Sequence, residues 1–457
     1  MKHSKLVPLF KAGIKSDPTN YRPISILPTF SKIFEKIILK QLLVHFNSNN
    51  LLHNNQYGFT KGRSTTDAGI GLLCSIFEAW EESRDALGVF CDLSKAFDCV
   101  DHTTLIRKLH HYGIRDSALN LLTSYLRNRT QRVDVNSKRS TGTKIELGVP
   151  QGSILGPFLF LIYINDLPYL VKDNDNEIVL FADDTSLIFK VKRQQSNYDE
   201  VNCALSKIVN WFNVNNLLLN SNKTKCLRFT LPNVKQVQTN LLLNDEKMNL
   251  VDTTVFLGVT LDYKMQWGPH IAKLADKLSS AAYAVRKIRE ICDEDTAKLV
   301  YYSYFHSRMS YGILLWEKAD DINTIFVLQK RAIRSIYKMS SFESLREKFK
   351  EIRILTVISQ NILDNLLYVR KNVNNFKTKN DIHFRNTRNK HKLDIPITRL
   401  SKVSKSFKGQ CIRLFNKIPE NVQNLSINKF KKVVKERLCA KAYYKVNDFI
   451  NDGTSWE

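Results

Sequence analysis

Hydrophobic residues in the first part of the chain recur at helical spacing. The apolar positions of SKIFEKIILKQLLVHF predict a helix with Ser31 as its N-cap, and a second helix is predicted from about residue 66 to residue 82. The preceding NYRPISILP is expected to form a proline-punctuated loop. Between the two helices lies QYGFTKGRST, a polar, glycine-containing segment that suits a loop facing a phosphate.

From Leu87 the pattern changes to short β-rich runs. These runs are LGVFCDLS, QRVDVN, TKIELGVP, IVLFADDTSLIFKV, KCLRFTL and VFLGVTLD. Helical patterns fit between them at 103–127, 157–170 and 197–218. Interleaving of this kind predicts an α+β fold in which helices cover one face of a sheet. Past Trp267 the hydrophobic periodicity is almost wholly helical.

Two of the β-rich runs carry aspartates at a strand end or turn. Asp92 follows GVFC, and Asp183 lies with Asp184 in FADDT. Adjacent like charges repel and strands disfavour Asp, but Mg²⁺ removes the conflict because it binds carboxylate oxygens and leaves sites for water and phosphate. Three such carboxylates can hold two ions roughly 4 Å apart, an arrangement that supports nucleotidyl transfer. Taken singly, FADDT is equally typical of a hairpin turn, and Asp92 of a helix N-cap.

The charge balance favours a polyanionic partner. The formal net charge is +25, and residues 266–457, with 37 basic and 19 acidic side chains, contribute +18 of it. Neutralised phosphates release counterions, so this surplus favours nucleic acid, although basic helices are also often only solvated surfaces. The eight cysteines show no zinc spacing, and neither a signal peptide nor a membrane-spanning stretch is evident. We therefore expect an intracellular protein, in the nucleus or the cytoplasm, that is soluble or held by its partners.

Seven sequence blocks stand in the order and at the spacing of one protein family. They are NYRPISILPTFSKIFEKI, QYGFTKGRSTTDA, DLSKAFDCVDH, GVPQGSILGPFLFLIYINDL, FADDT, LNSNKTKCLRF and VFLGVTLD. Between Asn20 and Asp262 the chain resembles the reverse transcriptase of non-LTR retrotransposons, particularly the jockey-like and chicken-repeat-like groups. A looser similarity continues through residues 267–338 to the Lys-rich C-terminal region.

This resemblance implies an RNA-directed DNA polymerase that uses two Mg²⁺ ions, for which Mn²⁺ can substitute. Asp92 and Asp183 match the principal metal ligands and catalytic residues, with Asp184 and the Leu93 carbonyl in support. Phe97 stands where the family keeps an aromatic ring beneath the sugar. There the ring would clash with a ribose 2′-OH and select deoxynucleotides, whereas the alternative is an ordinary core aromatic.

Further positions of the resemblance imply nucleotide contacts. Gln151 and Gly152 in GVPQGS match the segment that lines the nascent base pair, where glycine permits close backbone approach. Arg22 in NYRPIS matches an arginine that grips the triphosphate, and its alternative is a surface salt bridge. Lys223 in NSNKTK matches a lysine near the leaving pyrophosphate, but Lys225 is close enough to compete. FLGV resembles the primer grip or an ordinary buried strand.

The fold that the resemblance implies is the right-hand polymerase. We expect fingers at 1–86 with returns near 127–147, a palm with an antiparallel sheet at 87–265, a helical thumb at 266–345 and a basic helical region at 346–457. The expected partners are an RNA template, a DNA or RNA primer and dNTPs. In KRAIRSIYK, helical spacing puts four basic side chains on one face for phosphate contacts: Lys330, Arg331, Arg334 and Lys338.

The resemblance leaves two alternative functions open, and the sequence lacks a recognisable nuclease. No endonuclease, Cys/His knuckle or RNase H carboxylate set is recognisable. We therefore expect a polymerase from a truncated or fragmentary element copy, with any endonuclease supplied from elsewhere. A catalytically silent nucleic-acid-binding remnant is disfavoured because all three aspartates are present. An RNA-synthesising polymerase on the same palm is disfavoured by Phe97.

Overall fold

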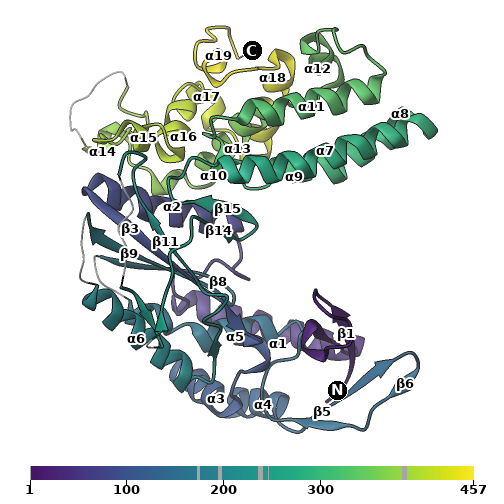
Figure 1. Ribbon diagram of the computed structural model, residues 1–457, viewed down its shortest axis with the longest axis vertical. Coiled ribbons are helices and arrows are strands. Elements are labelled where there is room, and N and C mark those ends of the chain that lie inside the picture. The colour runs from purple at the N-terminus through teal and green to yellow at the C-terminus, as the bar shows by residue number, and fades with distance from the viewer. Residues whose placement is uncertain are drawn as a thin grey trace. The chain divides into compact units, whose positions relative to one another are not determined.

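In the first part of the chain, a four-stranded antiparallel sheet runs in the order β11-β3-β9-β8 (Figure 1). The computed structural model describes residues 2–171, 175–193, 198–234, 240–244, 246–382 and 389–456. Every residue of β3 after its first is buried, so both faces of the sheet are covered. This layered arrangement confirms the predicted α+β class, but the prediction that helices cover one face of the sheet is wrong, because helices lie on both faces. The strands are β3 (Arg84–Cys91), β8 (Asn176–Phe181), β9 (Asp184–Lys192) and β11 (Lys225–Phe229).

The chain divides into two compact units. The first comprises Met1–Ile76 and Arg84–Val251, and the second comprises Phe77–Ser83 and Asp252–Glu457. The predicted division into fingers, palm, thumb and basic C-terminal region is finer than these two units and stays a prediction. Among the described residues, no helix combines the length and the apolar character that a membrane crossing requires.

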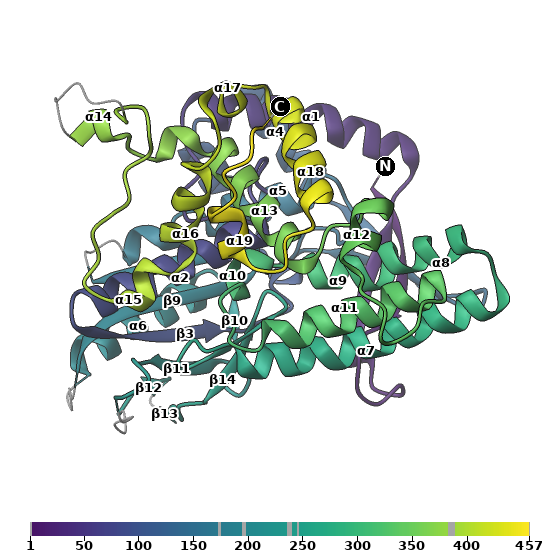
Figure 2. The same ribbon diagram turned by 90° about the horizontal axis from the view of Figure 1, so that it is seen from above.

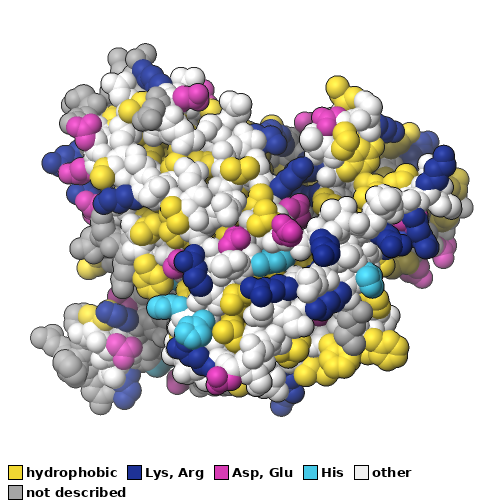
Figure 3. Space-filling view, turned by 90° about the horizontal axis from the view of Figure 1, so that it is seen from below, with side chains coloured by type: hydrophobic (Ala, Val, Ile, Leu, Met, Phe, Trp, Pro, Cys, Tyr) yellow, Lys and Arg dark blue, Asp and Glu magenta, His cyan; other side chains and the backbone are white. Residues whose placement is uncertain are grey.

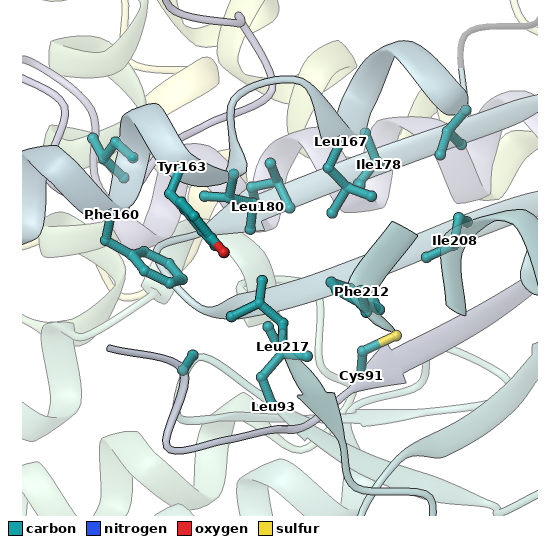
Figure 4. Packing of buried hydrophobic residues seen from close by; sticks show 14 of the residues in the cluster. Cys91, Leu93, Phe160, Tyr163, Leu167, Ile178, Leu180, Ile208, Phe212 and Leu217 are labelled. Carbon is teal, nitrogen blue, oxygen red and sulfur yellow. The ribbon is translucent and has the colours of Figure 1, made fainter. Parts of the chain in front are cut away.

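Helices cover the sheet of the first unit. On one face lie α3 (His102–His111), α5 (Gly156–Ile164) and α6 (Asp199–Val214), and the first turns of α2 (Thr65–Glu81) lie along the other face (Figures 1 and 2). Alternate residues of β3 join the hydrophobic cluster that includes almost all of α5, as the period of two in a strand requires. Figure 4 shows side chains that meet in this cluster, among them Phe160, Tyr163, Leu180 and Phe212.

A second sheet joins the start of the chain to residues further on. β1 (His3–Phe10) pairs antiparallel with β2 (Tyr21–Ile26) and parallel with β5 (Arg129–Val135). The prediction of a loop over NYRPISILP is therefore wrong, because most of this segment is a strand. β2 lies at the edge of its sheet. Pro23 is tolerated there, since an edge strand needs ladder donors on one side only.

Two helix predictions differ from the structure. Ser31 is not an N-cap: α1 (Thr29–Ser48) starts after Pro28, whose fixed φ angle leads into the helix, and Ser31 is buried. The predicted helix at 103–127 is broken into α3 and α4 (Asp116–Leu126). The break follows from Gly113, which has a φ of 88° and ends α3 in the left-handed region.

The surface of the first unit mixes basic and apolar side chains. On the face that Figure 3 shows, Lys and Arg side chains are scattered between gatherings of hydrophobic ones. α1 exposes Phe30, Ile33, Phe34 and Ile37 at helical spacing. The shorter elements of this unit are η1 (Pro18–Asn20), β4 (Leu93–Ser94), η2 (Ala96–Asp98), β6 (Lys138–Arg139), β7 (Thr143–Ile145), η3 (Leu167–Leu170), β10 (Leu218–Leu219), β12 (Leu242–Leu243) and β13 (Glu246–Lys247).

In the second unit the described residues form helices and one β-hairpin, β14 (Thr253–Phe256) with β15 (Val259–Asp262). The long helices α7 (Gly268–Ile291) and α11 (Ile322–Tyr337) pack together, and α13 (Val357–Lys371) packs on α16 and α18. The remaining elements are α8 (Glu294–Val300), the π-helix η4 (Tyr301–His306), α9 (Ser307–Ser310), α10 (Ile313–Trp316), α12 (Arg346–Ile352), η5 (Val373–Asn375), α14 (Lys379–Ile382), α15 (Ser401–Ser404), α16 (Phe407–Phe415), α17 (Glu420–Gln423), α18 (Ile427–Lys441) and α19 (Val446–Ile450).

Candidate active site

The aspartates of FADDT lie in a tight hairpin. Phe181 at the end of β8 pairs with Asp184 at the start of β9, so Ala182 and Asp183 form a two-residue turn. Ala182 has a φ of 57°, a left-handed value that is uncommon outside glycine. The hairpin turn that the sequence left open is therefore present, and it holds Asp183 at its tip.

Strand register brings Asp92 beside this turn. β3 and β9 are antiparallel, and their last pair is Cys91 opposite Thr185. One step further, the pairing would place Asp92 opposite Asp184. Asp92 follows a strand and is not a helix N-cap. Its backbone is held on both sides, because Asn220 N donates to Asp92 O at 2.8 Å and Asp92 N donates to Thr224 Oγ1 at 3.3 Å.

All nine residues predicted for the metals and the nucleotide line one cavity of about 860 Å³ in the first unit. Lys225, the competitor of Lys223, is not among the lining residues. Prediction from the sequence missed Lys11, Lys95 and Asp98, which also line the cavity. The nine residues are Arg22, Asp92, Leu93, Phe97, Gln151, Gly152, Asp183, Asp184 and Lys223.

Four acidic and four basic side chains line the cavity, and their surroundings raise the pKa values of Asp183 and Asp184. Desolvation raises the pKa of Asp183, repulsion from Asp92 acts in the same direction, and Arg22 and Lys11 oppose it. The Asp184 side chain is exposed, yet desolvation by the cavity walls, followed by repulsion from Asp183 and Asp92, raises its pKa to about 6. Such shifts mean that the cavity destabilises the charged carboxylates unless positive charge is added.

The three carboxylates lack fixed counterions. Within the described part of the chain, no Lys, Arg or His side chain forms a salt bridge with Asp92, Asp183 or Asp184. No three His, Cys, Asp or Glu side chains of the described residues come close enough together to form a complete metal site. The acids therefore share a cavity without being gathered around one point, and a metal held there would also need ligands from backbone, water or substrate.

Phe97 belongs both to the core and to the cavity. Its ring stacks on Phe160 of α5, with centroids 4.5 Å apart and an interplanar angle of 29°. The edge of the ring meets Phe59, another lining residue, at a centroid distance of 6.4 Å. Phe97 is half-buried, so part of the ring remains open to the cavity. The core packing and the sugar contact are thus compatible in one side chain.

The segment 148–152 is tied to the loop after Asp92. Gly148 N donates to Val100 O at 2.7 Å, and Val149 N donates to Phe97 O at 2.8 Å. Gln151 Nε2 donates to Asp98 Oδ1 at 2.9 Å. Since the side-chain nitrogen of Gln151 donates to Asp98, its side-chain oxygen Oε1 is left as an acceptor. Burial raises the pKa of Asp98, and the hydrogen bond from Gln151 counteracts this rise.

Gly152 and Arg22 lie on neighbouring parts of the wall. Gly152 has a φ of 116°, and a Cβ there would lie 2.5 Å from Ser25 O, so only glycine fits. Ser25 N also donates to Gln151 O at 2.6 Å, which joins this segment to β2. Arg22 on β2 is exposed, and no acidic side chain of the described residues lies within salt-bridge distance of it. The structure does not support the salt-bridge interpretation of Arg22.

The four predicted basic residues lie in the second unit: Lys330, Arg331 and Arg334 are in the second half of α11, and Lys338 follows its last residue. Arg331 and Lys338 are exposed. Lys330 is half-buried, with its ammonium 4.8 Å from the centroid of the Phe326 ring. Arg334 is half-buried as well and donates through Nη2 to Glu343 O at 2.9 Å. Only two of the four side chains are therefore fully presented to solvent.

The chain belongs to the reverse transcriptase (RNA-dependent DNA polymerase) family, whose family model matches residues 11–261, more than half of the chain. This membership confirms the family that the sequence blocks resemble, together with its fold class. The cavity lies within the matched residues, since each of its lining residues falls between 11 and 261.

Named relatives come from non-LTR transposons. The chain is 29% identical over 338 residues to a probable RNA-directed DNA polymerase from transposon BS of Drosophila melanogaster, covering 70% of this chain and 36% of that protein. It is 27% identical over 368 residues to the RNA-directed DNA polymerase from mobile element jockey of the same species, covering 77% and 39%. The chain thus spans less than two fifths of the length of these relatives.

Among solved structures, telomerase from Candida albicans in complex with a fragment of telomeric RNA matches with a TM-score of 0.46 and 13% identity, covering 81% of this chain and 59% of that one.

Proposed function

We propose that this chain is an RNA-directed DNA polymerase that extends a primer 3′-hydroxyl with dNTPs along an RNA template and releases pyrophosphate. One observation carries the proposal. Three carboxylates from adjacent strand ends line a single cavity without a salt-bridge partner among the described residues. Because uncompensated acids in a desolvated site are unfavourable for folding, their presence is best explained by a cationic ligand.

Asp92, Asp183, Asp184 and the Leu93 carbonyl are the residues that would hold Mg²⁺, since hard divalent cations prefer oxygen ligands. When bound, two Mg²⁺ ions lower the pKa of the attacking hydroxyl and stabilise the leaving pyrophosphate. The basic residues at the cavity wall bind the triphosphate. Arg22 supplies a planar, bidentate donor, and Lys223 and Lys11 add positive charge to the cavity wall.

The remaining lining residues orient the nucleotide. The side-chain oxygen of Gln151 accepts from a sugar hydroxyl, because the side-chain nitrogen already donates to Asp98. Gly152 allows the base pair to approach the backbone. Phe97 lies beneath the sugar, and its ring excludes a 2′-hydroxyl by steric contact. The division into fingers, palm, thumb and basic C-terminal region belongs to the same proposal, with primer-template held by phosphate contacts of the second unit.

Primer extension on poly(rA)/oligo(dT) with dTTP and Mg²⁺ tests the proposal. The expected result is processive addition by the wild-type chain and none by Asp92→Asn, which keeps the size of the side chain but removes its charge. Omission of Mg²⁺ should stop addition, and Mn²⁺ should restore it. Binding of the primer-template without any extension under these conditions would instead favour a catalytically silent nucleic-acid-binding remnant.

The sugar contact has a test of its own. Phe97→Val should admit rNTPs while use of dNTPs persists, because the smaller side chain leaves room for the 2′-hydroxyl. Incorporation of rUTP and dTTP by the wild type and the variant gives the discrimination ratio directly. An unchanged ratio in a folded, active variant would show that Phe97 serves the core through Phe160 and does not select the sugar.

A further inference from the structure

A short segment of QYGFTKGRST lies along the outer edge of β8. Tyr57 N donates to Leu180 O at 2.8 Å, and Leu180 N donates to Asn55 O at 2.9 Å. Gln56 and Leu180 thereby form a parallel bridge. β8 is the last strand of its sheet, so residues 55–57 extend the pairing by one more short segment on that side. This pairing brings Gln56 next to the turn that carries Asp183.

The Gln56 side chain bonds to the turn itself. Gln56 is 4% exposed, and its Oε1 accepts from Ala182 N at 3.1 Å and from Gly58 N at 2.8 Å. Ala182 is the turn residue with the left-handed φ of 57°. A non-glycine residue keeps such a conformation only where its surroundings enforce it. The amide that Gln56 engages therefore belongs to the strained residue that directly precedes Asp183.

Gly58 makes this contact sterically possible. A Cβ at position 58 would lie 2.3 Å from Ala182 N and 2.9 Å from Phe181 C. The two backbones therefore touch directly, and no side chain fits between them. Because Gly58 N shares the Gln56 oxygen with Ala182 N, one buried amide fixes both sides of the contact.

We propose that Gln56 is a positioning residue for the carboxylates of the active site. Its side-chain oxygen accepts from two backbone N–H groups and holds the Ala182–Asp183 turn in the conformation that presents Asp183 to the cavity. The inference rests on the proposed function insofar as Asp183 is a metal ligand. Partners that orient metal ligands usually matter for metal affinity nearly as much as the ligands do. Loss of the Gln56 oxygen should thus weaken metal binding more than it weakens the fold.

The test uses the full chain with Gln56→Met, which keeps the length of the side chain but has no amide oxygen. In the metal-free protein, hydrogen exchange at the β8–β9 turn should become faster, because Ala182 N loses its acceptor. The affinity for Mn²⁺, measured by electron paramagnetic resonance, should fall on the order of ten-fold. The Mg²⁺ concentration that gives half-maximal primer extension should rise by a similar factor. The maximal rate at saturating Mg²⁺ should change less than the Mg²⁺ requirement.

Gln329→Met is the matched control. Gln329 is a fully buried glutamine of the second unit whose Oε1 accepts from Val357 N at 2.8 Å. Its replacement removes the same kind of hydrogen bond, together with two that its Nε2 donates to Tyr301 Oη and Leu355 O, but should leave both the turn exchange and the Mn²⁺ affinity unchanged. Gln56→Asn is a second variant for the case that the methionine variant does not fold. It retains an amide, but its shorter side chain cannot reach both N–H groups, and the same directions are expected.

The outcomes separate the inference from the proposed function. Turn exchange and Mn²⁺ affinity equal to wild type in a folded Gln56 variant would overturn the inference, even if the enzyme is an active polymerase. Equal losses in the Gln56 and Gln329 variants would overturn it too, because general destabilisation then explains the result. If wild type extends no primer while the turn still loosens in Gln56→Met, the proposed function fails and the structural role of Gln56 stands.

Discussion

Desolvation acts both on Asp183 and Asp184 in the cavity of the first unit and on Glu317 in the second unit, but these carboxylates have different contacts. Desolvation raises the pKa of Asp183 and of Glu317. Glu317 is 7% exposed, and its Oε2 accepts from the Nδ2 atoms of Asn361 and Asn365, both at 2.6 Å. The carboxylates of the cavity have no comparable pair of amide donors among the described residues. The chain thus supplies Glu317, a carboxylate inside the fold, with its own hydrogen-bond donors.

Asp85 in the first unit makes the same point with a charge pair. It is fully buried on β3, and Arg228 on β11 donates to its Oδ2 through Nε at 3.0 Å and Nη2 at 2.8 Å. The Arg228 side chain is 1% exposed. Arg228 thus neutralises Asp85, whereas Asp92 and Asp183 have no salt-bridge partner among the residues that the structure describes. The difference supports the proposal that these acids bind a cation from outside the chain, since stability alone would pair or replace them.

Asp183→Asn should give the largest effect and should separate activity from stability. Primer extension is expected to fall roughly 1,000-fold, as for loss of one essential charge that stabilises a transition state. The melting temperature should stay equal or rise, because one of several repelling carboxylates is removed. Primer extension and thermal unfolding of the same preparations check both parts. A markedly lower melting temperature would break the comparison by showing that Asp183 supports the fold.

Asp85→Asn should behave in the opposite way. Removal of one partner of a buried pair leaves the Arg228 charge uncompensated, which costs about 3 kcal/mol of unfolding free energy. Urea unfolding measures this loss. The Mg²⁺ dependence of any remaining folded enzyme should equal that of wild type, because Asp85 does not line the cavity. A stable Asp85→Asn protein with altered Mg²⁺ dependence would contradict the assignment of Asp85 to the fold.

The same contrast explains what the sequence could predict. Asp92 and Asp183 lie in short contiguous motifs at strand ends, and Gln151 lies in a short motif before α5; in these motifs residue type and spacing already indicate the chemistry. Gln56 reaches the site only through its bridge to Leu180, which is 124 positions away in the sequence, and Lys11 reaches it through the register of the β1–β2 hairpin. No local pattern marks such positions.

The limits are similar for the fold. The α+β class and most strands followed from hydrophobic periodicity, whereas the parallel pairing of β1 with β5 depends on partners more than 100 positions apart. Helical spacing also put four basic residues of KRAIRSIYK on one face, but it could not indicate that Glu343 O would engage Arg334. Tertiary contacts of this kind decide which predicted side chains remain free.

His270 sharpens the comparison with a pH dependence. Its Nδ1 accepts from Thr260 N at 3.3 Å, its Nε2 is buried without a hydrogen-bond partner in the described residues, and Lys277 and Lys273 add repulsion. Desolvation in the first place, and then these lysines, lower the pKa of His270 to about 4 from its usual 6.5. Between these values the unfolded chain binds more protons, so the unfolding free energy falls as the pH drops from about 6.5 toward 4.

The expected loss from His270 between pH 7 and pH 5 is about 2 kcal/mol. His270→Asn keeps an acceptor for Thr260 N but cannot take up a proton. Urea unfolding of both proteins at the two pH values measures the change, and the variant should lose less stability by that amount. An identical pH dependence in the two proteins would mean that the imidazole is protonated as readily in the folded chain as in the unfolded one.

The smallest effect is expected at the exposed cations of the second unit, where charge faces solvent instead of a cavity. Charge reversal at Arg331 and Lys338 should reduce the log–log salt slope of primer-template binding by about 0.7 to 0.9 for each lost phosphate contact and shorten each extension run. Single-nucleotide addition at saturating primer-template should stay near normal, because neither residue lines the cavity.

Arg334 is left unchanged in this experiment, since its hydrogen bond to Glu343 O makes it part of the local fold. Lys207→Glu, on an exposed position of α6, changes the charge as much as either single reversal does, and as the control it should leave the slope unaltered. If both changes flatten the slope equally, net charge governs binding and α11 has no special part in it.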